Sequence, residues 1–291
     1  MPLTLLISAS TRALGFDRER GFFDLKNRRN LTLILGLIIT GFMLCAILLG
    51  FIKTPYDPSA IDAAAKLQAP SAAHLLGTDN FGRDILSRVL EGAGTTLFIA
   101  AATVFFGAAI GCTIGAFTGY FGGWLDDVLM RVNDMITAFP SILLALVLIS
   151  ILGPGKYNVI IALGILFVPS FSRIVRSEFA RQRELDYVKS ARIMGASAFR
   201  IMFVHILPNV RDVLLSSVAI GFNNAVLAEA SMSYLSIGVQ PPDASLGRML
   251  SESQSYFSSA PWYAIFVGSS IVLLILGFSL IGEGLGGSRR A

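Results

Sequence analysis

The sequence predicts an all-α membrane protein with six transmembrane helices. Hydrophobic residues make up 54% of its 291 residues and charged residues only 14%, against roughly 25% charged in soluble domains. The apolar run at residues 31–52 contains 22 residues without a charge, and as a helix it would span about 33 Å, enough to cross a bilayer. Runs of this length are too long for the core of a soluble domain, so we expect the chain to lie in a membrane.

Six apolar runs are expected to cross the membrane. The first follows six basic residues, and it begins too far along the chain and is too long for a cleaved signal peptide, so we interpret it as a retained span. Pro140 and Pro169 fall within the third and fourth runs, where proline kinks a helix and opens a cavity. The expected spans are residues 31–52, 95–117, 128–152, 159–175, 210–235 and 262–281.

The second run carries a glycine at every fourth position. This spacing places the glycines on one face of a helix, where they let another backbone approach closely. Such stripes are common wherever membrane helices meet, so we expect a packing role. The glycines are Gly107, Gly111, Gly115 and Gly119.

The basic residues predict the orientation of the chain. With the N-terminus inside, the inner segments carry 16 of the 23 Lys and Arg residues and the outer segments carry 6, while Arg131 lies at the inner end of the third span. Because basic residues favour the cytoplasmic side, we expect a cytoplasmic N-terminal arm (residues 1–30) and a cytoplasmic C-terminus. Residues 53–94 are expected to form an ordered outer segment, and residues 236–261 an outer loop with short helical pieces.

Metal binding and catalysis find no support in the residue pattern. Cys45 and Cys112 lie within apolar runs, so we expect buried thiols, and His74 and His205 are far apart and belong to no HExxH pattern. The one stretch similar to a phosphate-binding loop, residues 153–157, lacks the upstream glycine and the hydroxyl residue after the lysine. We therefore expect no metal site, no cofactor and no ATP hydrolysis in this chain.

A charged segment at residues 178–208 lies between long apolar runs. Eight basic residues lie in or beside it. At roughly 3 kcal/mol for each at the bilayer centre, burying them would cost on the order of 24 kcal/mol. The segment is therefore expected outside the lipid. Its basic residues are Arg173, Arg176, Arg181, Arg183, Lys189, Arg192, Arg200 and Arg211.

Two short helices joined by a tight turn are expected in this segment. Residues 183–194 are mostly good helix formers, and Gly195 is placed to end that helix in a left-handed conformation. Ser197 is placed to cap the second helix, and Pro208 marks the entry to the fifth span. Apolar residues recur in the second helix at i, i+3, i+4 and i+7, which predicts one apolar face. They are Phe199, Met202, Phe203 and Ile206.

The same local pattern describes a basic helix-turn-helix that reads DNA. Here, however, both ends of the segment run into membrane spans within a few residues, which leaves no free domain to enter a major groove. A solvated basic loop that only orients the protein is the remaining structural interpretation.

Residues 188–195 (Val-Lys-Ser-Ala-Arg-Ile-Met-Gly) are followed, after nine residues, by His205-Ile206-Leu207-Pro208. This stretch resembles the cytoplasmic coupling motif of binding-protein-dependent ABC importer permeases. The glycine and the Leu-Pro pair match the motif. Lys189 and Ser190 stand where the motif has its glutamate and first alanine.

Further stretches resemble the C-type subunit of the dipeptide/oligopeptide/nickel permease family. The resemblance covers nearly the whole chain after the N-terminal arm. It implies the type I ABC importer permease fold, with a six-span permease domain over residues 31–291 and a cytoplasmic coupling helix, in the cell (inner) membrane of a bacterium or archaeon. The stretches are Leu76-Gly77-Thr78-Asp79, Gly82-Arg83-Asp84, Ala138-Phe139-Pro140, Val239-Gln240-Pro241-Pro242 and Ala260-Pro261-Trp262.

The resemblance implies a transport subunit rather than an enzyme. Its implied partners are a B-type permease, two ATPase subunits that bind ATP and Mg²⁺, and an extracytoplasmic solute-binding protein. The chain would form half of a translocation path for di- or oligopeptides, and nickel, a metal chelate or a glutathione-type solute is the alternative cargo. An ion-coupled secondary transporter, a different class, would need charged or unwound sites at the membrane midplane, where this chain has few charges.

The resemblance also assigns residues to the ATPase contact. We expect closure of the partner ATPases to move the helices of residues 183–205 as a rigid body, and spans three to five to relay this motion into alternating access. The residues expected at the contact are Glu184, Leu185, Asp186, Tyr187, Ser190, Ala191, Met194, Gly195 and Ala196.

Polar residues within the spans are candidates for the translocation path, because they are costly in lipid and usually face a bundle interior. Asn223 and Asn224 lie near the middle of the fifth span. Glu229 lies near its outer end, where a hydrogen-bonded helix end is an equally good interpretation. Asp134, close to Arg131 in the third span, is expected to form a structural ion pair.

Overall fold

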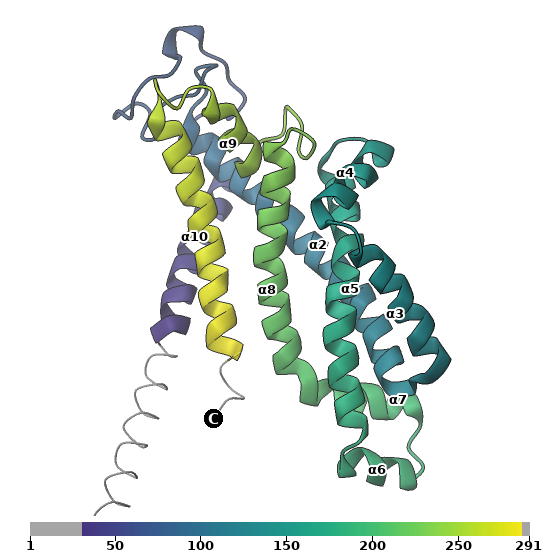
Figure 1. Cartoon of the computed structure of the whole chain (residues 1–291). Helices are drawn as coiled ribbons and strands as arrows, with labels where there is room; N and C mark the ends of the chain where they lie inside the picture. Colours follow the sequence, from purple (N-terminus) through teal and green to yellow (C-terminus); the bar gives the residue numbers. More distant parts are fainter. Residues whose placement is uncertain (1–30, 287–291) are drawn as a thin grey trace, which may run out of the picture.

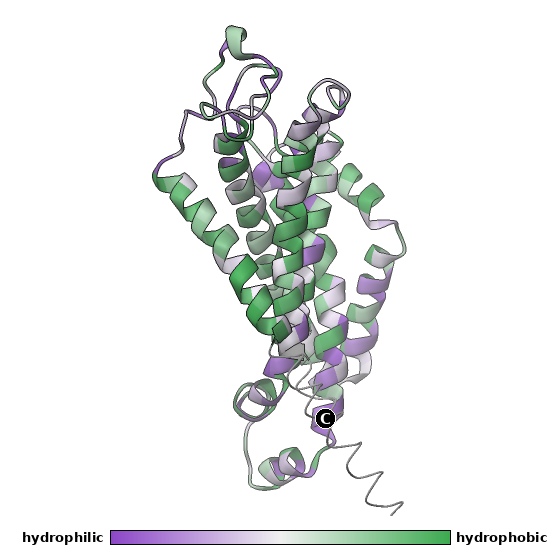
Figure 2. Ribbon diagram, turned by 90° about the vertical axis from the view of Figure 1, so that its left-hand side faces the viewer, coloured by the Kyte–Doolittle hydropathy of each residue, from purple (hydrophilic) through white to green (hydrophobic). Residues whose placement is uncertain are grey.

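The computed structural model describes residues 31–286, which form a bundle of long α-helices (Figure 1). Within this range, five helices are long and apolar enough to cross a membrane, and one bent helix pair makes a sixth if it is counted as a single span. Figure 2 shows apolar residues along the long helices. The five are the N-terminal helix Leu31–Ile52, α2 (Ile85–Phe121), α5 (Lys156–Arg183), the continuous helix Ala198–Tyr234 and α10 (Pro261–Gly286).

The two ends of the bundle carry short helices. At one end lies α6 (Asp186–Ile193), and at the opposite end lies α9 (Leu246–Gln254), beside the irregular segment that follows the N-terminal helix (Figure 1). We call these the α6 end and the α9 end. The irregular segment contains one short helix, η1 (Ala63–Ala65). The predicted arm at residues 1–30 lies outside the described residues.

The third expected span, residues 128–152, is sharply bent at Pro140, which confirms the predicted kink. The region forms α3 (Gly123–Thr137) and α4 (Ser141–Leu152), which meet at 89°. Pro140 precedes α4 in an extended conformation with ψ 125°, and because proline also disfavours helical geometry in the residue before it, the helix cannot run through. By contrast, α5 continues through Pro169.

Helix α2 begins ten residues before the predicted start at residue 95. Asp84 caps it, since the Asp84 side chain accepts a hydrogen bond of 2.8 Å from the backbone N–H of Ser87. With 37 residues, α2 is about 55 Å long, far longer than the roughly 30 Å hydrocarbon core. It crosses the molecule obliquely, from α9 and α10 to α3 and α5 (Figure 1).

The glycine stripe of α2 packs against α5, in agreement with the predicted packing role. A Cβ atom at Gly111 would lie 2.6 Å from the carbonyl oxygen of Val168, and one at Gly107 would lie 2.7 Å from the Cβ of Phe167. Contacts under 3.0 Å are not tolerated by real Cβ atoms. The two backbones are therefore held at a separation that only glycine permits.

Three apolar clusters fill the bundle. One joins α2, α8 (Leu207–Tyr234), α9, α10 and the N-terminal helix. A second lies among α2, α4, α5 and α8. The third lies at the α6 end and joins α2, α5, α6 and the helix that leads into α8. Neither cysteine belongs to the buried set: Cys45 is exposed and Cys112 is half-buried, so the expectation of buried thiols was wrong.

Replacing Gly111 by alanine should destabilise the protein. The added methyl would overlap the α5 backbone, at a cost of about 1–3 kcal/mol, and the apparent unfolding temperature in detergent should fall. Gly268→Ala is the matched control, because Gly268 lies in α10 with nothing within 4 Å of an added Cβ. Equal unfolding temperatures for the two variants would contradict this packing.

Candidate functional site

The charged segment at the α6 end folds as two helical pieces around a tight turn. Helix α5 runs to Arg183 and α6 begins only at Asp186, not at residue 183 as predicted. Gly195 has a φ of +82°, which confirms the predicted left-handed residue. Ser197 accepts a hydrogen bond of 3.4 Å from the N–H of Arg200, which confirms the predicted cap.

The second helical piece is more continuous than predicted. Short α7 (Ala198–Arg200) passes through a π-helical stretch, η2 (Ile201–Ile206), directly into α8. The π-helical stretch shifts the helix register, so the predicted apolar face is only half buried. Met202 and Ile206 are buried, whereas Phe199 and Phe203 are exposed and stack with ring centroids 6.3 Å apart.

Most residues expected at the ATPase contact lie on the outer surface of α6 and its turn. Ala191 is the exception, since it is 4% exposed and packs inward. Ile193, absent from the sequence-based set, is 87% exposed beside Met194 at 80%. The signal in the sequence that could have identified Ile193 was its position two residues before Gly195, at the end of the predicted helix. The exposed members are Glu184, Leu185, Asp186, Tyr187, Ser190, Met194 and Gly195, and Ala196 is half-buried.

Helix α6 is anchored to the end of α2 as well as to α5. Val188 and Ala191 of α6 belong to the apolar cluster at the α6 end. Arg183, the last residue of α5, donates a 3.1 Å hydrogen bond from Nη1 to the carbonyl oxygen of Tyr120, which lies in the last turn of α2. The Arg192 guanidinium lies 5.7 Å from the centroid of the Tyr120 ring. A force on α6 therefore reaches α2 directly.

The three residues expected in the translocation path point in different directions. Asn223 faces α10. With its amide turned so that both of its polar atoms find partners, the nitrogen donates to the Ile275 carbonyl oxygen at 3.2 Å. Glu229 is 0% exposed and accepts hydrogen bonds from Thr96 (2.9 Å) and Ser233 (2.7 Å). Only Asn224 lines the cavity described next. The interpretation of Glu229 as a hydrogen-bonded residue near a helix end therefore fits its place in the structure.

A cavity of about 490 Å³ opens between α4, α5 and α8. Most of its walls are apolar, and none of the described residues that line it is charged. Asn224 and three serines supply the polar groups. The serines are Ser141, Ser170 and Ser217.

Polar contacts tie α3 to α5 beside this cavity. Asp134 pairs with Arg173 of α5 at 2.8 Å, rather than with Arg131 as predicted. Asn133 donates a buried hydrogen bond of 3.0 Å to Ser172. Arg176 donates from Nη2 to Asp126 at 2.6 Å. Because Asn133 is the only buried residue of α3, these contacts do much to hold α3 in place.

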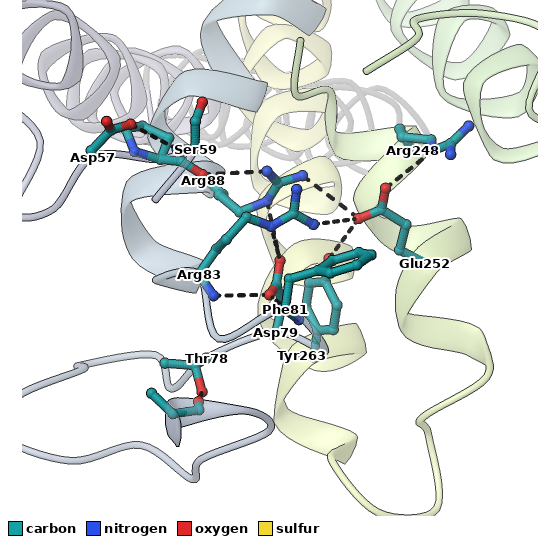
Figure 3. Close-up of polar contacts among 12 residues, drawn as sticks. Asp57, Ser59, Thr78, Asp79, Phe81, Arg83, Arg88, Arg248, Glu252 and Tyr263 are labelled. Carbon is teal, nitrogen blue, oxygen red and sulfur yellow. Dashed lines mark hydrogen bonds and ion pairs between the residues drawn. The ribbon is translucent and has the colours of Figure 1, made fainter. Parts of the chain in front are cut away.

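A network of ion pairs and hydrogen bonds fixes the α9 end (Figure 3). Glu252 of α9 accepts from Arg83 at 3.3 Å and from Tyr263 of α10 at 3.3 Å, and Asp79 accepts from Arg83 Nε at 2.6 Å. Arg88 is 3% exposed and lies between the two carboxylates, 3.5 Å from Asp79 and 3.6 Å from Glu252. This network joins four elements and was not predicted, because it brings together two groups of residues that lie more than 160 residues apart in sequence.

Comparison with known proteins identifies the chain's relatives. Residues 111–286 match the model of the family described as binding-protein-dependent transport system inner membrane component. The chain is 41% identical to the dipeptide transport system permease protein DppC of Alkalihalophilus pseudofirmus, over 89% of this chain and 85% of that protein. It is 40% identical to the glutathione transport system permease protein GsiD of Pectobacterium atrosepticum, over 79% and 77%.

A solved structure supports the fold. The inward-facing MetNI methionine ABC transporter matches with a TM-score of 0.55 at 20% identity, covering 67% of this chain and 93% of that chain. The predicted type I importer permease fold is thereby confirmed.

Glu252→Gln should loosen the α9 end. The change leaves Arg83 and Arg88 with the single carboxylate of Asp79, and the opening free energy of the segment between the N-terminal helix and α2 should fall by about 1–3 kcal/mol. Amide hydrogen exchange measures this. Asp243→Asn is the control, because the Asp243–Lys156 pair (2.9 Å) is 40% and 32% exposed and worth less than about 1 kcal/mol. Unchanged exchange in Glu252→Gln would contradict the anchoring role.

Proposed function

The chain belongs to the binding-protein-dependent transport system inner membrane component family, and we propose that it forms half of the translocation path of an ATP-driven importer of di- and oligopeptides. The relatives that support this cargo are dipeptide and peptide permeases. A glutathione-type solute is the second candidate, since one relative at 40% identity is a glutathione permease. Both cargo classes are short, amide-bearing carboxylates.

The observation that carries the proposal is the exposed surface of α6. Ile193 and Met194 project two large apolar side chains from a short helix whose inner face is buried in the apolar cluster. Apolar anchors of this kind, surrounded by polar residues, are typical of protein interfaces. In the proposed importer the partner is a cytoplasmic ATPase subunit that binds ATP and Mg²⁺, and the second half of the path is a B-type permease.

Orientation follows from this partner. The α6 end faces the cytoplasm together with both termini, and the α9 end faces outward, where a loaded solute-binding protein would dock. This arrangement also places most of the basic residues on the cytoplasmic side, as the positive-inside rule favours.

Closure of the two ATPases would pull α6, and α6 would carry α5 and α2 with it. The contact of Arg192 with Tyr120 joins α6 to α2, while the Arg183–Tyr120 hydrogen bond and the glycine stripe join α2 to α5. From the sequence alone, spans three to five are expected to relay this motion. We propose that α2 relays it as well. Rigid-body movement of these helices against α10 and the N-terminal helix would open the path on alternate sides.

Gly195→Val should uncouple ATP hydrolysis from transport. A β-branched residue is strained at φ +82°, so the turn after α6 would shift, although nothing lies within 4 Å of the new Cβ. Gly153→Val is the matched control, because Gly153 has φ +86° and its nearest neighbour, Asn158, is 3.9 Å away, but it lies in the turn between α4 and α5. Transport and ATPase rates of the reconstituted importer are measured together. Equal transport per ATP in the two variants would count against α6 as the coupling element.

Ile193→Asp should remove the ATPase partner. A charge placed in a desolvated apolar contact weakens binding by about 2 kcal/mol or more. The unmodified chain and the Ile193→Asp variant are each purified by affinity from the native membrane, and the co-purifying subunits are identified. A second permease should be recovered with both, but ATPase subunits only with the unmodified chain. Recovery of the unmodified chain alone, still moving solute without ATP, would contradict the proposed function and favour a secondary transporter.

A further inference from the structure

The cavity between α4, α5 and α8 has polar groups on all three helices. Ser217 and Asn224 are seven residues apart on α8, which places them on one face about 10 Å apart. Ser170 on α5 and Ser141 on α4 contribute from the opposite walls. A volume of 490 Å³ falls within the roughly 300–1,000 Å³ range of ligand pockets. The walls offer neutral hydrogen-bonding groups and apolar surface, which suit an amide backbone with small side chains.

The Arg173–Asp134 pair lies at the α6 end of this cavity. Arg173 follows Ser170 by three residues on α5, and Ile174 beside it lines the cavity. Thr137, which accepts a 2.6 Å hydrogen bond from Arg173 Nη2, precedes Ser141 by four residues across the break between α3 and α4. The ion pair is therefore adjacent to two of the cavity's serines, on the side nearer to α6.

The Arg173 side chain keeps donors available. Both of its hydrogen bonds, to Asp134 and to Thr137, come from Nη2, which leaves Nε and Nη1 to donate to another group. The Arg173 side chain is 47% exposed and that of Asp134 68%. Arg173 lies 17 residues, about 25 Å, along α5 from Lys156, near the inner end of the expected span of residues 159–175. An ion pair this exposed is stable in contact with water rather than with lipid.

We propose, on the basis of the proposed function, that this cavity is the cargo site of the subunit and that Arg173 contacts the cargo's carboxylate at the exit toward the cytoplasm. The ligand class is a short amide-bearing solute with a free carboxylate. Asn224 and the serines would bond its amides, the apolar walls would accept its side chains, and Arg173 would take the negative charge through Nε and Nη1. Asp134 and Thr137 hold the guanidinium in position.

The first test uses thiol labelling of the assembled importer in membrane vesicles, with Cys45 and Cys112 replaced by serine. Ser170→Cys is labelled with the negatively charged sulfonatoethyl and the positively charged trimethylammonioethyl methanethiosulfonates. Adding Arg173→Gln should lower the ratio of the negative reagent's labelling rate to the positive reagent's labelling rate about two- to threefold, because one positive charge is lost nearby. Adding Arg176→Gln should leave the ratio unchanged.

Arg176 is a matched control because it is also an α5 arginine paired with an α3 carboxylate, Asp126. Neither arginine is among the residues that line the cavity, but Arg173 lies three residues along α5 from Ser170 and Arg176 lies six. A role limited to holding α3 against α5 would make the two variants behave alike. Failure of Ser170→Cys to react with either reagent would show that lipid or the partner subunit fills the cavity, and it would overturn the proposal. So would an equal labelling ratio in all three backgrounds.

The second test measures ATP-driven uptake of alanyl-alanine into proteoliposomes that contain the complete importer and its loaded binding protein. Arg173→Gln should lower the uptake rate about tenfold, as expected from loss of a hydrogen bond to a charged group, while Arg176→Gln stays close to the unmodified rate. Equal uptake by both variants would overturn the role of Arg173 and leave the proposed function standing. Absence of ATP-driven uptake by the unmodified importer would instead overturn the proposed function, and the labelling ratio does not depend on that outcome.

Discussion

The close approach of α2 to α5 is the constraint on which the rest of the structure depends. At Gly107 and Gly111 the two backbones meet where a methyl group would not fit, so this pair cannot slide or separate without losing much of its packing. The pair also joins the two ends of the molecule. Helix α6 contacts the last turn of α2 through Arg192 and Tyr120, and the opposite end of α2 carries Arg88 into the network around Glu252. A rigid pair with these attachments can transmit movement from one side of a membrane to the other.

Helices α3 and α4 are held more loosely than the α2–α5 pair. Helix α3 buries one residue, Asn133, and reaches α5 through polar contacts, while the 89° break at Pro140 separates α3 from α4. The cavity lies against this weakly packed part. Polar ties exchange partners with water more readily than an apolar interface does, so the cavity borders the elements that can move. The tightly packed pair provides the fixed side against which they move.

Much of this was predictable from the sequence, where a local pattern decided the structure. The long apolar runs gave the spans, the spacing of Gly107 and Gly111 gave a packing face, and Gly195 and Ser197 gave the turn after α6. What the sequence could not decide depends on tertiary context. The kink at Pro140 was predicted, but its 89° angle is set by packing. The apolar face of residues 199–206 was predicted, but not that only Met202 and Ile206 of it are buried. The network around Glu252 joins residues far apart in sequence, and no short motif marks it.

The central claim is that α2 and α5 move as one unit that follows α6. It is tested most directly by electron–electron distance measurements in the assembled importer, with spin labels on exposed residues outside the α6 surface: Phe105 on α2, Arg181 on α5 and Val272 on α10. On passing from the nucleotide-free to the ATP-bound state, the Phe105–Arg181 distance should stay constant while the Arg181–Val272 distance changes. A change in the Phe105–Arg181 distance would contradict the account.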